Sequence, residues 1–388
     1  MTPKFVDGNK LQLLRNGTDY FPALQQAIDA AKVEIYLETY IFRDDETGQA
    51  IAAALARAAR RGVAVRVLVD GFGCKDHFAE IRERLLAANV QVLIYRPKIS
   101  PLTLRRNRLR RMHRKLAVID ARVAFAGGIN IIDDMDTPGD NPPRYDYAVR
   151  IEGPLLAPIV EEVERLWIRG ARAWASRRRR RRDKRIVAVD ATPRGSQRAA
   201  LVVRDNLRHR SDIEDAYLAA IGNARVEIII ANAYFFPGVR FRRALLDAIR
   251  RGVRVRLLLQ GRVEYFLQHY ASRAFYGPLL DAGVEIYEYK HGFMHAKVAV
   301  IDQRWSTVGS SNIDPFSLLL AREANIVVDD QPFAQELRRN LQQGMESGAM
   351  IVARTAWRNQ PWLERALIWA SYNFVRLLMG LTGYADKQ

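Results

Sequence analysis

The 388-residue sequence contains two copies of one pattern of strands and helices, one in each half of the chain. Three segments of the first half recur in the same order in the second half: residues 32–42 in 225–236, 54–71 in 244–261, and 84–95 in 278–289. Each recurring segment alternates as a strand does or joins a helix to a strand. Repeats of this kind predict an α/β fold in which helices cover mixed or parallel sheets.

The tetrapeptide RRGV, at 60–63 and 250–253, supports the alignment of the two halves. We expect its glycine to lie just past the end of a helix, where a left-handed residue is favoured. The separation between matching positions is smaller at His113 and His295 than at Gly62 and Gly252. The first half therefore contains an insertion, which lies within the basic stretch 96–111.

A longer motif, H-x-K-x4-D-x6-G-[GS]-x-N, occurs once in each half, at 113–130 and 295–312. Its first part alternates as a strand and turns at the aspartate, and the chain then returns as a second strand. Side chains two apart in a strand point to the same face, and a hairpin brings the returning asparagine near that face. The motif thus gathers one imidazole, one ammonium and one carboxamide in each half: His113, Lys115 and Asn130, and His295, Lys297 and Asn312.

These residue types suit phosphoryl chemistry. An imidazole can attack phosphorus or move a proton near neutral pH, while lysine and asparagine can hold phosphate oxygens as charge develops. Two halves facing each other would place two histidines on opposite sides of one phosphodiester. Asp120 and Asp302 belong to the motif, and we expect them to fix the turn and balance charge.

Two further carboxylates enter alternating strands downstream of the histidines. Asp146 follows the first motif and Glu323 follows the second, at comparable separations from His113 and His295. A carboxylate that hydrogen-bonds a catalytic imidazole fixes its tautomer and raises its basicity. We expect this orienting role for both; the alternative is an ordinary surface acid.

The paired motifs at 113–120 and 295–302 resemble those of the phospholipase D superfamily, and the resemblance covers roughly residues 10–345. It implies two tandem α/β domains, each a mixed sheet flanked by helices, related by a pseudo-two-fold axis with the active site between them. It implies a phosphohistidine intermediate without a metal or cofactor. The first histidine is usually the nucleophile and the second the acid and later the base, although the near-symmetry leaves the reverse assignment open.

Within that superfamily the chain most resembles short bacterial cardiolipin synthases without N-terminal membrane spans, through segments such as LETYIF, HRKLAVID and GSSNIDPFS. Two departures are Phe316, where arginine is frequent, and GGIN in the first motif, where GS-x-N is commoner. The resemblance implies transfer of a phosphatidyl group from one phosphatidylglycerol to a second, with release of glycerol. A phospholipase D-type lipid hydrolase and a nuclease of the same superfamily are the alternatives.

The charge of the chain points to a phosphate-bearing partner. Its 61 basic residues, 51 of them arginine, exceed its 43 acidic residues and give a net charge of +18, and arginine forks bidentately onto phosphate. Charge alone fits nucleic acid or an anionic membrane. The insertion 96–111 has no aromatic residue to stack on bases, which favours a lipid over nucleic acid. Together with the resemblance, this makes an anionic phospholipid and a membrane surface the expected partners, and nucleic acid the less favoured one. The single cysteine, Cys74, excludes a disulfide framework.

The sequence indicates two domain boundaries. The two repeated halves join near the arginine run 176–185. We predict a first domain at 1–185, a second at 186–350 and an amphipathic tail at 351–388. Charged residues interrupt the apolar run 362–381, so it suits an interfacial helix better than a membrane span; packing on the protein's own core is the alternative. No secretory signal is visible at the start, and we expect a peripheral location on the cytoplasmic face of the bacterial inner membrane. The sequence leaves the oligomeric state open.

Overall fold

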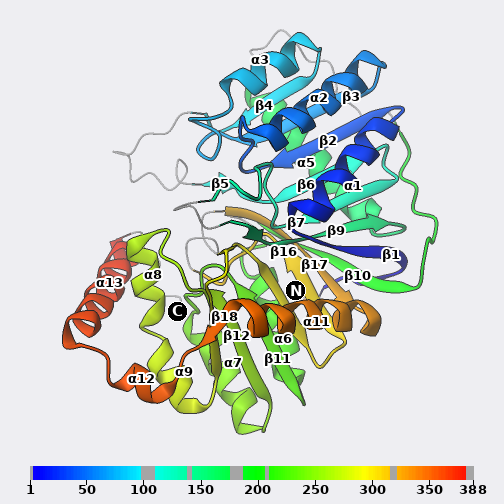
Figure 1. Cartoon of the computed structure of the whole chain (residues 1–388). Coiled ribbons are helices and arrows are strands. Elements are labelled where there is room, and N and C mark those ends of the chain that lie inside the picture. The colour runs from blue at the N-terminus through cyan, green and yellow to red at the C-terminus, as the bar shows by residue number, and fades with distance from the viewer. Residues whose placement is uncertain are drawn as a thin grey trace.

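A computed structural model shows two lobes stacked one above the other (Figure 1). It describes residues 3–97, 110–137, 142–174, 187–205, 209–314 and 321–381, without the side chains of 171–174 and 378–381. The arginine run 176–185, most of the insertion 96–111 and Phe316 lie outside the described residues. The expectations for these segments therefore stay predictions.

One mixed sheet runs through both lobes, and its strand order is the same in each half when read outward from the centre. At the centre, β1 (Val6–Arg15) and β10 (Gln197–Arg204) pair antiparallel. Outward from β1 follow β9 (Tyr147–Glu152), β7 (Val123–Gly127), β6 (Lys115–Ile119), β2 (Glu34–Thr39), β3 (Ala64–Asp70) and β4 (Gln91–Tyr95). Outward from β10 follow β17 (Ala321–Asp329), β16 (Trp305–Gly309), β15 (Lys297–Ile301), β11 (Glu227–Asn232), β12 (Arg254–Gln260), β13 (Glu285–Tyr289) and β18 (Ala349–Ile351).

The pairing directions repeat as well. In the first half β2, β3 and β4 are parallel, whereas β6, β7, β9 and β1 continue the sheet antiparallel. The corresponding strands of the second half pair in the same directions. The predicted α/β class and the two tandem domains are confirmed.

Helices cover both faces of the sheet. In the first half they are α1 (Asn16–Ala30), α2 (Glu46–Arg60) and α3 (Ala79–Ala87) on one face and α5 (Leu156–Trp174) on the other. In the second half they are α6 (Asp212–Asn223), α7 (Val239–Arg250), α8 (Phe266–Arg273) and α9 (Tyr276–Ala282) on one face and α11 (Gln331–Gly348) on the other. One apolar cluster, which includes residues of α5, α11 and strands of both halves, forms a shared core.

The ends of two helices follow from single residues. Gly62 and Gly252 lie just beyond α2 and α7 with φ of 92° and 85°, which is the left-handed conformation that favours glycine after a helix. Asp45 begins α2, where its side chain accepts the Gly48 amide at 2.8 Å. The two glycines end their helices just before the buried strands β3 and β12, and Asp45 sets the start of α2.

Three strands of only two residues each form pairs that join the two lobes. β5 (Arg111–Met112) pairs in parallel with β17 of the second half. β14 (Phe293–Met294) pairs in parallel with β8 (Arg144–Tyr145) of the first half. Each of β5 and β14 directly precedes a motif histidine, so each histidine is anchored to the opposite lobe.

The C-terminal segment consists of α12 (Arg354–Arg358) and α13 (Trp362–Leu381). One face of α13 packs on the second lobe: Ile368 and Val375 are buried, and the Tyr372 ring stacks on Phe236 with centroids 5.9 Å apart. The opposite face exposes Trp369 and other large apolar side chains. Among the described helices, none has both the length and the apolar character required to span a bilayer.

Candidate active site

The two motif histidines lie at the seam between the lobes, each at the start of a strand hairpin. The backbone amide of His113 donates to the Arg322 carbonyl at 3.0 Å, and that of His295 donates to the Tyr145 carbonyl at 2.8 Å. Both carbonyls belong to the other half of the chain. The backbone itself therefore brings the two motifs together.

Each imidazole is held by a carboxylate of the opposite half. The Nδ1 atom of His113 lies 3.0 Å from the Oε1 atom of Glu323, and the Nδ1 atom of His295 lies 2.7 Å from the Oδ2 atom of Asp146. The sequence had suggested both carboxylates as orienting groups but not which imidazole each would contact. Because Nδ1 is occupied in both rings, Nε2 is the nitrogen left for chemistry.

The motif lysines are buried beside the histidines. Lys115 donates to the His113 carbonyl at 2.6 Å, and Lys297 makes the equivalent contact with the His295 carbonyl. Burial lowers the pKa of Lys115 to about 7 and that of Lys297 to about 8, against the opposing pull of Glu323 and Asp146. Two ammonium groups whose charge is poorly solvated are well placed to hold an anionic substrate.

Burial also sets the protonation of the imidazoles. It lowers the pKa of His113 below the ordinary value of 6.5, although Glu323 opposes the shift. The pKa of His295 falls well below that value, because Lys297 and Lys115 add to the effect of burial. Both rings are therefore neutral near pH 7, which is the form in which an imidazole attacks phosphorus or accepts a proton.

The two asparagines follow the returning strands and are buried. The Asn130 carboxamide oxygen accepts the Ile41 amide at 3.1 Å, so part of this side chain supports the backbone. Asn312 lies at the equivalent place beyond β16. The direct contact of either carboxamide with phosphate stays a prediction.

The motif aspartates lie just beyond the ends of β6 and β15, roughly 20 Å along an extended strand from the histidines that precede those strands. The Asp120 carboxylate accepts three backbone amides at the start of β2, at 2.8, 2.8 and 2.9 Å. Asp302 accepts three at the start of β11, at 2.7, 2.8 and 2.9 Å. The structure brings together the histidines, lysines and supporting carboxylates, and it places these two aspartates elsewhere.

Several residues of the site were not identified from the sequence. The Tyr40 ring meets the His113 ring edge to face, with centroids 4.8 Å apart. Burial raises the pKa of Glu264 to about 7, while Arg144 and Lys297 oppose the shift. Tyr40 and Glu264 follow the carboxyl ends of the parallel strands β2 and β12, and that location is the signal that could have revealed them.

Arg114, which lies between His113 and Lys115 in the first motif, is fully buried. Its guanidinium donates to Glu38 of β2 at 2.6 Å and to Glu162 of α5 at 2.5 Å. This network joins β6 to a neighbouring strand and to the helix on one face of the sheet. It fixes the start of the strand that presents His113 and Lys115.

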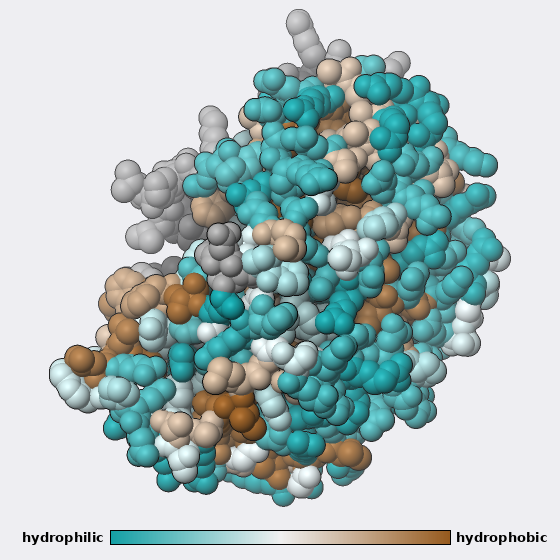
Figure 2. Space-filling model, in the orientation of Figure 1, coloured by the Kyte–Doolittle hydropathy of each residue, from teal (hydrophilic) through white to brown (hydrophobic). Residues whose placement is uncertain are grey.

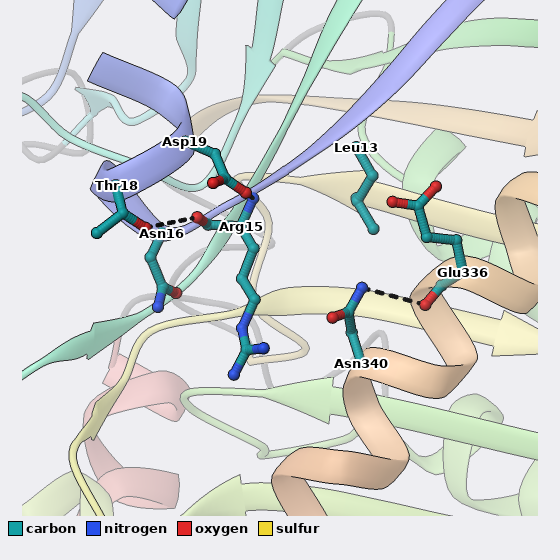
Figure 3. A pocket seen from close by; sticks show the side chains of 7 residues that line it. All are labelled: Leu13, Arg15, Asn16, Thr18, Asp19, Glu336 and Asn340. Atoms are coloured by element: carbon teal, nitrogen blue, oxygen red, sulfur yellow. Dashed lines mark hydrogen bonds between the residues drawn. The ribbon is translucent and has the colours of Figure 1, made fainter. Parts of the chain in front are cut away.

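A polar pocket of about 440 Å³ lies at the seam between the lobes (Figure 3). Its lining combines the β1–α1 junction with the α11 face: Leu13, Arg15, Asn16, Thr18, Asp19, Glu336 and Asn340. The Asn16 side-chain oxygen accepts the Asp146 amide at 3.0 Å. The pocket therefore adjoins the backbone of Asp146, whose carboxylate holds the His295 ring.

Among the described residues, no group of three or more His, Cys, Asp or Glu side chains is arranged so that it could hold a metal ion. The charged groups around the histidines are the two lysines, the two carboxylates and, at His295, also Arg144. The arrangement can activate a nucleophile, hold an anion and transfer a proton.

Comparisons with known proteins agree with this geometry. Residues 24–167 and 217–345 match the family described as cardiolipin synthase, phospholipase D-like domain. The chain is 41% identical over 380 residues to cardiolipin synthase B of Escherichia coli K12, covering 97% of this chain and 90% of the relative. It is 30% identical over 389 residues to cardiolipin synthase A of Pectobacterium carotovorum, covering 96% and 76%.

Solved structures show the same fold at low sequence identity. The phosphatidylserine synthase of Haemophilus influenzae superposes with a TM-score of 0.71 at 13% identity, over 97% of this chain and 95% of that one. The polyphosphate kinase of Porphyromonas gingivalis gives a TM-score of 0.58 at 17% identity, over 96% and 53%.

The duplicated mixed sheet and the facing His–Lys pairs define a two-domain enzyme of phosphodiester chemistry. The chain belongs to the phospholipase D superfamily, in its cardiolipin synthase family. It is a phosphatidyltransferase of that superfamily, as the resemblance of the motifs had implied.

Proposed function

We propose that this enzyme transfers a phosphatidyl group from one phosphatidylglycerol to a second and releases glycerol. The observation that carries the proposal is the pair of imidazoles, each held through Nδ1 by a carboxylate of the opposite lobe, at 3.0 and 2.7 Å. Identity of 41% to a cardiolipin synthase B over nearly the whole chain supports the choice of substrate.

In the first half of the reaction, Nε2 of His113 attacks phosphorus and forms an N–P bond. The bond from phosphorus to the glycerol oxygen breaks, and protonated His295 supplies the proton that the leaving glycerol needs. Lys115 and Lys297 stabilise the negative charge on the phosphoryl oxygens. The bound anion also offsets the lysine charges that lower the pKa of His295, so it helps this ring to carry its proton.

In the second half, a headgroup hydroxyl of another phosphatidylglycerol gives its proton to His295. Its oxygen attacks phosphorus, the N–P bond breaks, and His113 returns to its neutral form with cardiolipin as the product. Asp146 and Glu323 are positioning residues that hold the rings. Asp120 and Asp302 act through the fold, by fixing the strands beside the motif.

The test is to incubate the purified enzyme with phosphatidylglycerol vesicles and identify the lipids by mass spectrometry, with glycerol measured in parallel. We expect cardiolipin and glycerol in equal amounts, and a phosphoenzyme in wild type but not in His113→Ala. The matched control is His77→Ala, an exposed histidine, which should retain both. Phosphatidic acid without cardiolipin would mean a lipid hydrolase, and neither product would return the nuclease to consideration.

We further propose that the enzyme acts as a peripheral protein on the cytoplasmic face of the bacterial inner membrane. The exposed apolar face of α13, with Trp362, Trp369, Phe374 and Leu377, supports this location, since interfacial helices insert such residues at the bilayer surface. The predicted tail 351–388 would dock there, while its buried face stays on the second lobe.

A further inference from the structure

A second cavity lies in the second lobe, between helices α7, α9, α12 and α13. It has a volume of about 790 Å³, which is within the range of small-molecule sites. None of its lining residues belongs to the paired motifs or to the supporting carboxylates. The cavity and the candidate active site therefore have no residue in common.

The lining is strongly basic. It contains five arginines and neither aspartate nor glutamate: Arg242, Arg243, Arg273, Arg358 and Arg365. Aromatic rings support two of these side chains, because Arg242 lies 4.8 Å over the Phe275 ring and Arg273 lies 5.3 Å over the Trp357 ring. Stacked guanidinium groups are pre-oriented donors for phosphate oxygens.

Part of this positive charge is not neutralised by the protein. Arg358 donates to Asp281 at 2.7 Å, and Arg273 lies 3.5 Å from Glu288 and 3.8 Å from Glu364. Across the described part of the chain, by contrast, no ion pair joins a carboxylate to Arg242, Arg243 or Arg365. An anionic ligand would therefore meet free guanidinium groups in the cavity.

The remaining lining is mostly apolar and includes side chains of α13. Leu246, Ile368, Trp369 and Tyr372 contribute to it, and Trp369 is 69% exposed. Brown, hydrophobic side chains gather at this corner of the molecule, over α13 and α8 (Figure 2). A small soluble anion would gain nothing from contact with these apolar side chains. A phospholipid matches both parts of the cavity, because its phosphate can contact the arginines and its acyl chains the apolar surface.

We infer that this cavity, here called the α7–α13 groove, binds one anionic phospholipid of the bilayer outside the catalytic site. The phosphate lies among Arg242, Arg243 and Arg365, and the acyl chains follow the apolar wall toward the exposed face of α13. The bound lipid fixes α13, and with it the second lobe, on the membrane. This inference rests on the proposed membrane location and not on the identity of the reaction.

The test uses co-sedimentation with phosphatidylcholine vesicles that contain or lack phosphatidylglycerol. Arg243→Glu with Arg365→Glu reverses two unpaired charges, and Ala274→Phe fills the cavity without changing charge. Both variants should bind phosphatidylglycerol vesicles roughly tenfold more weakly or worse. The matched control, Arg60→Glu with Arg122→Glu, reverses two exposed arginines of the first lobe and should bind within about twofold of wild type, since a few surface charges outside a site contribute little.

Three results would overturn the inference: Ala274→Phe binding as wild type does, the control losing as much as the groove variant, or soluble glycerol 3-phosphate displacing the protein from vesicles. Cardiolipin formation from phosphatidylglycerol in detergent micelles should persist in the groove variants, because no bilayer is needed there. If wild type formed no cardiolipin while the groove variants still lost vesicle binding, the proposed function would fail and the groove would stand.

Discussion

The two carboxylates that hold the histidines belong to side chains of different length, glutamate and aspartate. The motif residue beside each carboxylate differs in size accordingly. Glu323 accepts the Ser310 hydroxyl at 2.5 Å. At the equivalent place in the first motif stands Gly128, where an added Cβ atom would clash with the Asp146 carboxylate. The departure from GS-x-N noted in the sequence thus has a steric reason, because the shorter aspartate occupies the space that a serine would take.

This complementarity predicts the effect of Gly128→Ser. The new side chain displaces Asp146 from Nδ1 of His295, and we expect kcat to fall roughly 10- to 100-fold, as for loss of an orienting partner. Single-turnover phosphoenzyme formation and steady-state kcat would be compared with Ser310→Gly, which leaves space empty and should cost less. Activity of Gly128→Ser equal to that of wild type would contradict the steric argument.

The shifted pKa values predict a bell-shaped pH profile. As the pH falls, Asp146, whose pKa burial raises to about 6, gains a proton and stops orienting His295. As the pH rises, Lys115 and Lys297, with pKa values of about 7 and about 8, lose the charges that hold the substrate. We expect kcat/KM, which reports groups of the free enzyme, to fall below about pH 6 and again above pH 7 to 8. A flat profile up to pH 9 would show that the lysine charges do not matter.

At the scale of strands, Asp120 fixes the hairpin of the first motif to the start of β2. Removal of its carboxylate in Asp120→Ala leaves three amides without their acceptor and puts alanine at a φ of 50°. We expect a loss of about 1–3 kcal/mol in the free energy of unfolding, measured by urea denaturation. Asp120→Asn should cost less, because one oxygen remains and asparagine tolerates the left-handed conformation.

The same pair of variants separates a structural role from a chemical one. If Asp120 acts through the fold, folded Asp120→Asn should form the phosphoenzyme at a rate close to that of wild type. A folded Asp120→Asn enzyme with a 100-fold lower rate would place this residue in the chemistry.

At the scale of helices, α13 has two faces with different roles. Replacing Trp369, Phe374 and Leu377 by serine changes only exposed positions, so we expect weaker binding to anionic vesicles with the melting temperature nearly unchanged. Deleting residues 362–388 should also lower stability, because Phe236 and Phe275 lose the Tyr372 ring. Vesicle binding by the serine variant as strong as that of wild type would assign α13 to core packing alone.

Local sequence patterns were sufficient for most elements but not for the short ones. The strands that contain Glu34 and Glu227 and the glycines after α2 and α7 were predictable, because hydrophobic alternation and helix capping act over a few residues. The crossing strands β5, β8 and β14 have only two residues each. They form because a distant strand offers a hydrogen-bonding edge, and no local pattern encodes that edge.

At the scale of the whole molecule, the paired motifs identified the histidines and lysines, but not the partners of the histidines. Both Asp146 and Glu323 could be picked out as acids entering strands. That each holds the imidazole of the other half depends on how the lobes meet, and β1 and β10 determine this by pairing across opposite halves of the chain. The Arg114 network was missed for a similar reason, since it needs β2, β6 and α5 together.

The shared core predicts that the lobes do not unfold independently. Leu337 of α11 is fully buried in the apolar cluster that contains Leu13 of β1 and Val149 of β9. Leu337→Ala should lower the free energy of unfolding by about 2–5 kcal/mol, although the residue belongs to the second half. Hydrogen exchange should accelerate in β1 and β9 as well as in β10 and β17, since the cavity weakens packing on both sides of the seam.

The matched control is Leu55→Ala in α2, an equally buried leucine that packs in the cluster of the first half alone. Its faster exchange should stay within the first lobe. Because His113 and His295 each depend on a carboxylate across the seam, Leu337→Ala should also make phosphoenzyme formation more sensitive to heat than Leu55→Ala does at equal loss of stability. Faster exchange confined to the second lobe in Leu337→Ala would show that the two domains are separate folding units that merely meet at the active site.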